Sequence, residues 1–254
     1  TWAGGQLQLQ ASSSQYIQLP AGILSNYAAV TIEAWVTFPD QLPVNCFFFG
    51  FGDTNGGEGN GYIFCAPRAG RIAITATNYT GEQNAYSGAD FSFQTNFHFV
   101  AVFNPPAGSI ALYTNGTLAA VNNAVTVPLS SINDVFNYIG RSLYSADPYP
   151  DLTLDEFRIY NGALSPAEIA ATQALGPDRL LSNARPFFNP PQRAGNNLLL
   201  SWPLASAGYI LLWRTDLIEG AWTPLTSPVP QIVGDQWQIP VPVTNGPQFF
   251  RLEK

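Results

Sequence analysis

The chain has 254 residues, of which 46 % are hydrophobic and only 11 % are charged, so it can bury a sizeable core without metals or many disulfides. Its net charge is −7 and its isoelectric point lies near 4.5, with Lys254 as the only lysine. This balance argues against nucleic acid as a partner, because phosphate recognition needs clustered Lys and Arg. No apolar run approaches the ~18 residues of a membrane span.

The chain contains no methionine and begins at Thr1. This start indicates a processed form, and a signal peptide removed before Thr1 is the simplest explanation. The sequence therefore predicts an extracellular or cell-surface location.

Alternating and β-branched runs recur along the first two thirds of the chain, separated by Gly, Pro and Asn turns. Within them, Asn115-Gly116 predicts a two-residue hairpin, because both turn positions need a positive φ. Short strands at such spacing indicate an antiparallel sandwich or jelly roll. The predicted strands and hairpin cover 7–10, 16–19, 30–38, 71–77, 97–104, 110–121, 136–142 and 152–160.

Cys46 and Cys65 are the only cysteines. Two apolar runs lie between them, joined by the Gly/Asn/Asp-rich loop 53–60, which predicts a hairpin. Folding this hairpin about its midpoint places Cys46 opposite Cys65, so a cross-strand disulfide is expected, in keeping with an exported chain. Two buried free thiols are the alternative.

A short helix is predicted over 166–175. Ser165 is its N-cap, Pro166 takes the first helical position, and Glu168 completes a capping box. Gly176 then suits the left-handed residue that follows many helices. The helix closes the first domain, whose predicted range is 1–176.

Several of these segments, in order, resemble laminin-G-like, concanavalin A-like lectin domains. The terminal "LDEFRIYNGALSPAEIAA" (154–171) is similar to that family's closing signature. The runs "VTIEAWV", "FHFVAVFN", "IALYTNGTLAAV" and "YIGRS" match its internal strands. The resemblance spans roughly residues 5–176 and implies a jelly roll of two curved antiparallel sheets. Members are mostly secreted, and many bind glycans or proteins or accompany enzymes, so the fold alone decides no activity.

The character of the chain changes after the helix. A polar, Pro-rich stretch over 177–197 predicts a linker, and the remainder, 198–254, resembles the small β-sandwich that closes many exported bacterial proteins. The whole chain is thus predicted to be all-β, with an antiparallel jelly-roll β-sandwich, one short helix and a small C-terminal β-sandwich. Its expected strands cover 198–202, 209–217, 222–226, 236–243 and 248–254, and its expected core contains Trp202, Trp213, Trp222 and Trp237.

Catalytic patterns are missing from the sequence, which predicts a protein that is not an enzyme. His98 is the only histidine, and its place in an apolar strand favours a structural role over that of a general base. Asp155 and Glu156 are adjacent on one predicted strand, so they point to opposite faces and do not form a glycosidase pair.

The family resemblance implies one further role for Asp155, as a ligand of a structural calcium together with backbone carbonyls. The family often has Asp-Gly after its first strand, whereas this chain has Gln10-Ala11. The alternative is a surface carboxylate that pairs with Arg158 or bonds a nearby loop.

Two polar loops with aromatic or amide side chains are candidates for glycan binding. Sugars stack on aromatic faces while amides and carboxylates bond their hydroxyls, the general plan of small-ligand sites. The alternative is that both loops are ordinary polar connections. The candidates are Tyr144, Asp147 and Tyr149 in the second loop, and Asp53, Asn55, Glu58 and Asn60 in the first.

Three functional hypotheses follow. The first is a non-catalytic extracellular module that binds a glycan or a cell-surface polymer. The second is a structural subunit of a filament or surface layer, which self-associates by adding its N-terminal segment 1–10 to an edge strand of a neighbour. A polysaccharide-active enzyme is the third and is disfavoured by the residues present.

Overall fold

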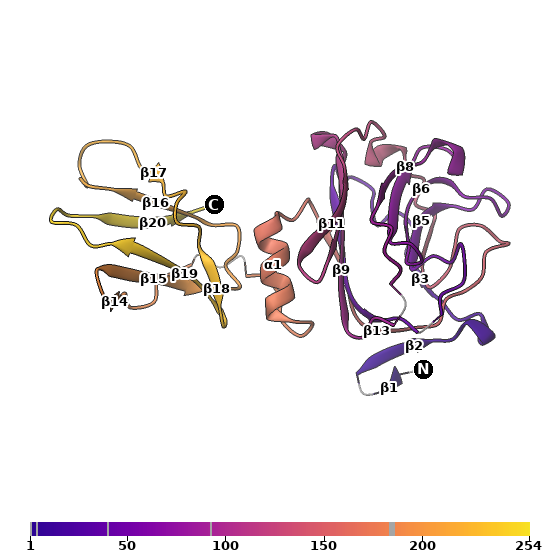
Figure 1. Cartoon of the computed structure of the whole chain (residues 1–254). Helices are drawn as coiled ribbons and strands as arrows, with labels where there is room; N and C mark the ends of the chain where they lie inside the picture. The colour runs from indigo at the N-terminus through magenta and orange to yellow at the C-terminus, as the bar shows by residue number, and fades with distance from the viewer. Residues whose placement is uncertain (1, 4, 40, 92, 183–185) are drawn as a thin grey trace. The chain divides into compact units, whose positions relative to one another are not determined.

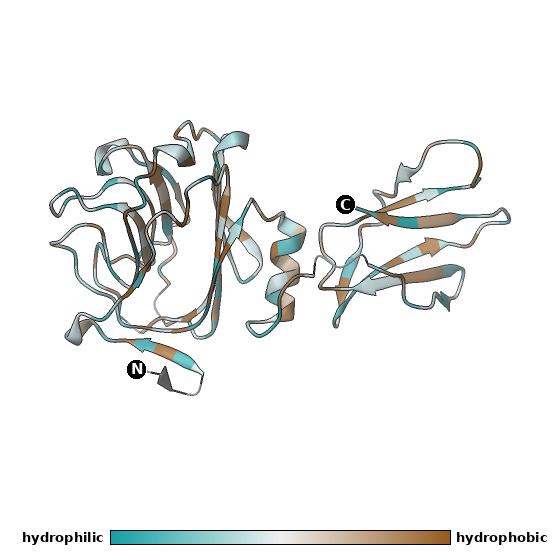
Figure 2. Cartoon of the chain, turned by 180° about the vertical axis from the view of Figure 1, so that it is seen from behind, coloured by the Kyte–Doolittle hydropathy of each residue, from teal (hydrophilic) through white to brown (hydrophobic). Residues whose placement is uncertain are grey.

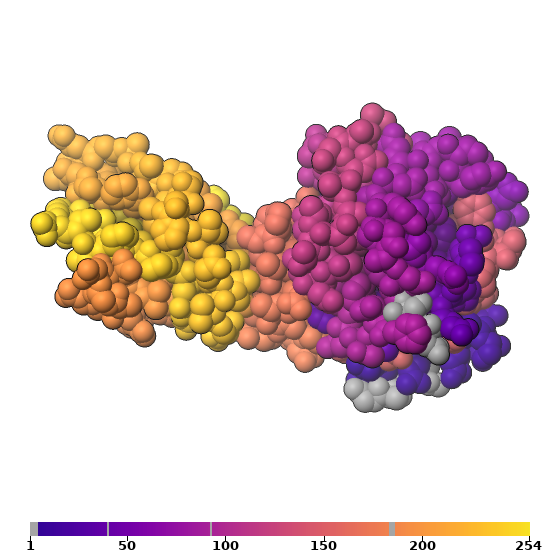
Figure 3. All heavy atoms as spheres, in the orientation of Figure 1, coloured from indigo at the N-terminus to yellow at the C-terminus, as the bar shows by residue number. Residues whose placement is uncertain are grey.

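The computed structural model describes residues 2–3, 5–39, 41–91, 93–182 and 186–254. The chain forms two compact units, Thr1–Pro166 and Ala167–Lys254, whose surfaces are shown in Figure 3. The division falls at the start of the helix, before the boundary at residue 176 that the sequence suggested. Among the described residues, no helix has the length and apolar character needed to cross a membrane.

The first unit is a sandwich of two antiparallel sheets (Figure 1), which confirms the predicted jelly-roll class. The seven-stranded sheet runs, in spatial order, through β1 (Trp2–Ala3), β2 (Gln6–Leu9), β13 (Leu152–Asn161), β4 (Val30–Thr37), β9 (Phe97–Asn104), β10 (Ser109–Thr114) and β11 (Thr117–Asn122). The six-stranded sheet runs through β3 (Ile17–Leu19), β12 (Phe136–Ile139), β5 (Phe49–Asp53), β6 (Asn60–Ala66), β7 (Arg71–Thr75) and β8 (Gln83–Tyr86). Short 3₁₀ turns lie at Ala11–Ser13, Tyr79–Gly81, Pro105–Ala107 and Leu129–Ser131.

The main core lies between the two sheets, and every second residue of a strand faces it. In β4, Ile32, Ala34 and Val36 belong to this core, while the residues between them face outward. The strands of the sandwich are accordingly rich in hydrophobic residues in Figure 2. The predicted hairpin is also present, since Thr114 pairs with Thr117 and both Asn115 and Gly116 have positive φ.

Strand β5 reads Phe-Gly-Phe-Gly, and the two residue types divide between its faces. Phe49 and Phe51 are fully buried in the main core. Gly50 and Gly52 therefore face outward, where space is short: a Cβ at Gly50 would lie 2.9 Å from a ring carbon of Phe47. Glycine at this position lets an aromatic side chain lie directly on the outer face of the sheet.

The predicted disulfide is absent. Cys46 and Cys65 are both buried free thiols. The pairing register explains the error. Cys65 pairs with Phe49, not with Cys46, because the hairpin closes between Asp53 and Asn60, off its midpoint, and a bulge between Phe51 and Asp53 shifts the register by one more residue. The alternative of two buried thiols is therefore the one that the structure supports.

Burial makes both thiols hard to ionise. It raises the pKa of Cys46 from 9.0 to about 12 and that of Cys65 well above 9.0, and the thiolate is the reactive form. We expect iodoacetamide at pH 8 to label neither cysteine in the native protein and both in guanidinium, without any reductant. Peptide mass spectrometry measures this directly. Labelling that requires prior reduction would contradict the free thiols.

The second unit contains α1 (Pro166–Leu175, from its second residue on) and two small antiparallel sheets. The helix has the predicted bounds, and Gly176 follows it with a φ of +81°. One sheet runs through β14 (Gln192–Ala194), β15 (Asn197–Pro203), β19 (Gln236–Pro242) and β18 (Gln231–Val233), and the other through β17 (Thr223–Pro224), β16 (Ile210–Arg214) and β20 (Phe249–Glu253).

The tryptophans of this unit divide between core and surface. Trp202 is buried and Trp237 packs against the same cluster, as predicted. Trp222 was predicted to lie in the core, but it is only half-buried, with the guanidinium groups of Arg214 and Arg251 at 5.3 and 4.6 Å from its ring. Cation–π contacts with two arginines keep this indole at the surface.

The prolines of β19 lie where one side of the strand is unpaired. Pro240 and Pro242 face β15, whereas β18 pairs only with the first three residues of the strand, Gln236 to Gln238. This one-sided pairing follows from the missing N–H of proline. At the other end of the chain, Trp2 and Ala3 pair with β2 of their own chain. Self-association through this segment stays a prediction.

Candidate functional site

A hollow of about 950 Å³ lies on the outer face of the six-stranded sheet. We call it the sheet pocket. Its lining combines aromatic rings, two arginines and three carboxylates, contributed by the strands β6 to β8 and by five connecting loops. The lining residues are Val44, Asn45, Phe47, Gly57, Glu58, Ala66, Arg68, Ala69, Arg71, Tyr79, Glu82, Asn84, Tyr144, Ser145, Ala146 and Asp147.

The base of the sheet pocket is apolar and well packed. A second hydrophobic cluster, separate from the main core, includes Phe47, Tyr62, Phe64 and Leu143. Phe47 stacks on Phe64 with ring centroids 4.3 Å apart and an interplanar angle of 10°. Because each of these four side chains is at most 3 % exposed, the base is rigid and can hold polar groups in place above it.

A chain of polar contacts runs across this base. The Tyr62 hydroxyl donates to Oε1 of Glu82 (2.7 Å), and the Arg71 guanidinium contacts Oε2 of the same carboxylate. Arg71 also donates to Oδ1 of Asn84 (2.9 Å) and lies 4.6 Å above the Phe64 ring. Both Glu82 oxygens are thus engaged, and burial together with hydrogen bonds to Tyr144 and Glu82 holds the pKa of Tyr62 well above its usual value.

Tyr144 joins the loop 142–147 to this chain of contacts. Its hydroxyl lies 2.9 Å from that of Tyr62 and accepts the backbone N–H of Tyr79 at 3.0 Å. Tyr62 has only one hydroxyl proton, which goes to Glu82, so Tyr144 donates to Tyr62. Gly59 makes room for this arrangement, since a Cβ there would lie 2.8 Å from the Tyr144 ring.

Asp147 lies at the rim of the sheet pocket. Its Oδ2 accepts the hydroxyl proton of Ser142 at 2.6 Å. Burial raises the pKa of Asp147, and the hydrogen bond from Ser142 opposes that shift. Tyr79 lines the same pocket and exposes 66 % of its surface, so the pocket combines a solvent-facing aromatic ring with polar groups that are already in position.

The structure brings together some of the residues that the sequence singled out. Tyr144, Asp147 and Glu58 line the sheet pocket. Tyr149 does not, because its ring lies against Tyr16 at 6.2 Å, in a cluster where Arg141 stacks on Tyr16 and Tyr138.

The other residues predicted in the first loop, Asp53, Asn55 and Asn60, shape the loop instead of lining the pocket. Asp53 accepts the N–H of Asn55 at 3.2 Å and a side-chain N–H of Asn133 at 3.0 Å. It also pairs with Asn60 across the hairpin. These contacts account for their polar character without a ligand.

Sequence reasoning missed several polar or aromatic residues of the pocket, among them Arg68, Arg71, Tyr79, Glu82 and Asn84. For Arg71 a signal was available. The alternation of "RIAITAT" puts Arg71 on the face opposite Ile72 and Ile74, and hence outside the core. Nothing in the sequence connected it to Glu82 or to the loop that carries Tyr144.

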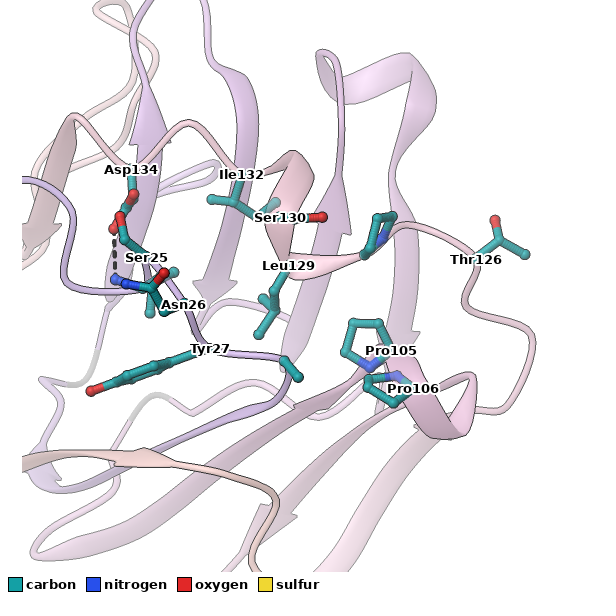
Figure 4. A pocket seen from close by; sticks show the side chains of 13 residues that line it. Ser25, Asn26, Tyr27, Pro105, Pro106, Thr126, Leu129, Ser130, Ile132 and Asp134 are labelled. Carbon is teal, nitrogen blue, oxygen red and sulfur yellow. Dashed lines mark hydrogen bonds between the residues drawn. The ribbon is translucent and has the colours of Figure 1, made fainter.

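A second hollow of about 650 Å³ lies among three loops of the same unit. In Figure 4, Pro105 and Pro106 line one side of it and Tyr27 the other. Asp134 accepts the backbone N–H of Leu24 at 2.7 Å, so its carboxylate ties two loops together. This contact accounts for Asp134, the one carboxylate among the described residues that line the hollow.

On the outer face of the seven-stranded sheet, Glu33 is fully buried and holds a polar cluster. Its Oε1 lies 2.9 Å from Nε2 of His98, and its Oε2 accepts from the Tyr160 hydroxyl (2.7 Å) and from Arg158 (3.3 Å). Nε2 therefore carries a proton, because a carboxylate only accepts. His98 is held in place by Glu33, in agreement with the structural role predicted for it.

Asp155, the predicted calcium ligand, is the extra residue of a bulge in β13 between Leu154 and Glu156. Arg158 pairs with Glu33 and Glu156. Within the described part of the chain, no three side chains of His, Cys, Asp or Glu gather into a group that could hold a metal. The side chains around Asp155 thus do not form a metal centre by themselves, and the calcium site stays a prediction.

Residues 11–170 match the family profile described as the concanavalin A-like lectin/glucanases superfamily. The chain belongs to this superfamily. The matched region covers more than half of the chain and nearly all of the first unit. The superfamily description names lectins and glucanases, which are both carbohydrate-binding proteins, so the family agrees with a sugar site at a coarse level. A comparison with curated protein sequences finds no match.

Solved structures resemble this chain at low sequence identity. The NanB sialidase of Streptococcus pneumoniae, as its K499G mutant, is 18 % identical with a TM-score of 0.51, over 79 % of this chain and 33 % of the sialidase. The chain thus spans about a third of that enzyme. Domain 4 of AbnA, an extracellular arabinanase of Geobacillus stearothermophilus in complex with arabinotriose, is 20 % identical with a TM-score of 0.49, over 61 % of this chain and 70 % of that one. The CBM40 module of the Ruminococcus gnavus IT-sialidase, bound to α2,3-sialyllactose, is 13 % identical with a TM-score of 0.47, over 65 % and 97 %.

Proposed function

We propose that this protein is a non-catalytic carbohydrate-binding module that acts outside the cell, and that the sheet pocket is its binding site. The observation that carries the proposal is the combination at one hollow of an exposed aromatic ring, Tyr79, with rigidly held polar groups. Sugar rings present C–H faces that stack on aromatics and hydroxyls that need paired donors and acceptors. The pocket provides both on a preformed base.

The contacts also support binding without cleavage. A glycosidase needs one carboxyl group to donate a proton and a second to act as base or nucleophile. In the sheet pocket both oxygens of Glu82 are engaged by Tyr62 and Arg71, and Asp147 is held by Ser142. Superfamily membership supports the sugar class. The extracellular setting is part of the same proposal, since most glycan polymers lie outside cells.

The decisive variant is Tyr79→Ala, which removes the exposed ring from the rim. We expect it to weaken binding of the preferred oligosaccharide five- to thirty-fold, because losing one well-placed aromatic contact costs about 1–2 kcal/mol. Isothermal titration calorimetry against a panel of neutral and acidic oligosaccharides measures this. The wild-type protein should release no reducing ends from any member of the panel.

Phe93→Ala is the matched control for this variant. Phe93 is 72 % exposed and does not line the sheet pocket, so its removal should leave binding unchanged. Equal losses in the two variants, or no loss in Tyr79→Ala, would show that the sugar binds elsewhere. Turnover of a panel member would refute the non-catalytic part of the proposal.

A further inference from the structure

Each of the two arginines of the sheet pocket already lies near a carboxylate. Its lining contains three carboxylates, Glu58, Glu82 and Asp147, and two arginines, Arg68 and Arg71. Arg71 contacts Glu82, and Arg68 lies 3.9 Å from Asp90 while also donating to the carbonyl of Leu42. Each cation therefore already has an anionic partner, and negative charge prevails around the hollow.

The pair of Arg71 and Glu82 cannot open easily to admit a second acid. The Glu82 side chain is only 6 % exposed and that of Arg71 is 34 % exposed. Tyr62 holds the other Glu82 oxygen, and Arg71 is further fixed by Asn84 and the Phe64 ring. An incoming carboxylate would meet Glu82 at short range in a partly desolvated site, where like charges repel strongly. A sugar hydroxyl meets no such repulsion, because it can both donate to carboxylates and accept from the remaining N–H groups of Arg71.

We propose that the sheet pocket selects uncharged saccharides and rejects acidic ones, with the Glu82–Arg71 pair as the determinant of this selectivity. This inference rests on the proposed function of the pocket. It assigns Glu82 a specificity role: the carboxylate neutralises the only guanidinium that lies over the apolar base. Without that carboxylate, Arg71 becomes a free binding group for an acidic sugar.

The test compares α-1,4-linked galactotriose with trigalacturonate, which carries a carboxylate in place of the CH2OH group at C6 of each of its three sugars, together with lactose and sialyllactose. We expect the wild-type protein to bind at least one neutral member at least tenfold more tightly than its acidic counterpart. In Glu82→Gln the ratio should fall about tenfold, since glutamine keeps the shape and its amide oxygen still accepts from Tyr62. Isothermal titration calorimetry at low and moderate salt measures the affinity ratio in the wild type and in Glu82→Gln.

Glu58→Gln is the control, because it removes the same charge from the exposed rim of the pocket. It should change the ratio less than twofold. If the affinity ratio falls equally in Glu58→Gln and Glu82→Gln, the selectivity follows from the net charge of the pocket. That result would overturn the role of the Glu82–Arg71 pair. Where Glu82→Gln fails to fold by circular dichroism, salt dependence in the wild type decides: screening should raise the affinity for the acidic sugar, and an affinity for it that falls with salt would overturn the proposed repulsion.

The two proposals fail in different ways. Equal or tighter wild-type binding of the acidic member of a pair would overturn the neutral selectivity and leave the carbohydrate-binding function in place. If neither the neutral nor the acidic sugars bind and Tyr79→Ala changes nothing, the proposed function itself is wrong.

Discussion

Glu33→Ala is expected to lower the free energy of unfolding by about 3–5 kcal/mol, the usual cost of leaving buried charges without their partner. Glu33 is fully buried, and its carboxylate binds His98, Tyr160 and Arg158 at once. Its loss leaves an arginine side chain that is only 10 % exposed without this anion. Urea unfolding followed by tryptophan fluorescence measures the change, and Trp35, which lies beside His98 and Arg158, is a local reporter.

Glu156→Ala is the control for Glu33→Ala on the same sheet. Glu156 also pairs with Arg158, at 3.6 Å, but it is 39 % exposed. Exposed pairs contribute about 0–1 kcal/mol, so this variant should be nearly as stable as the wild type. A loss of under 1 kcal/mol in Glu33→Ala would mean that the polar cluster relaxes or admits water. Sugar binding by folded Glu33→Ala should be unchanged, since the sheet pocket lies on the other sheet.

Phe47→Ala is expected to cost about 3–5 kcal/mol as well, the range for removing a buried Phe. Phe47 is 3 % exposed and stacks on Phe64 at 4.3 Å. Because this stack forms the base beneath Arg71, the variant should also weaken sugar binding at temperatures where it is folded. Thermal unfolding and calorimetry on the same samples separate the two effects.

Val44→Ala provides the comparison for Phe47→Ala. Val44 lines the same pocket but is 60 % exposed, and exposed positions usually change stability by less than about 0.5 kcal/mol. A Phe47→Ala protein that melts like the wild type would show that the second hydrophobic cluster adds nothing to stability. In that case the rigid base on which the sugar site depends would need another explanation.

The strands could be predicted wherever the sequence alternates or is β-branched. The run 30–38 became β4, and the capped segment 166–175 became α1 with the same bounds. Strand β8 was missed, because "QNAY" is polar and carries no apolar alternation. It forms only because Gln83 to Tyr86 pair with β7 at the edge of the sheet, and the residues of β8 by themselves do not predict that pairing.

The candidate site was predicted in part. Tyr144 and Asp147 stood out because an aromatic and an acid share one Pro-rich loop, and both do line the sheet pocket. Tyr149 stood out for the same reason, yet it lies against Tyr16. The direction in which a loop side chain points depends on the surface beneath it, and the loop sequence does not contain that surface.

The sequence by itself determined the all-β class, the order of the strands and the helix, because periodicity, turn residues and capping are local properties. Only the tertiary structure decided which residues meet. The closure of the hairpin between Asp53 and Asn60, together with a one-residue bulge, set the register that separates Cys46 from the position opposite Cys65. The packing of loop 142–147 onto the six-stranded sheet brought Tyr144 to Tyr62, and through it to Glu82 and Arg71. These contacts join residues up to 82 positions apart, so they depend on the sheet register and on the shape of the folded surface, which no local pattern encodes.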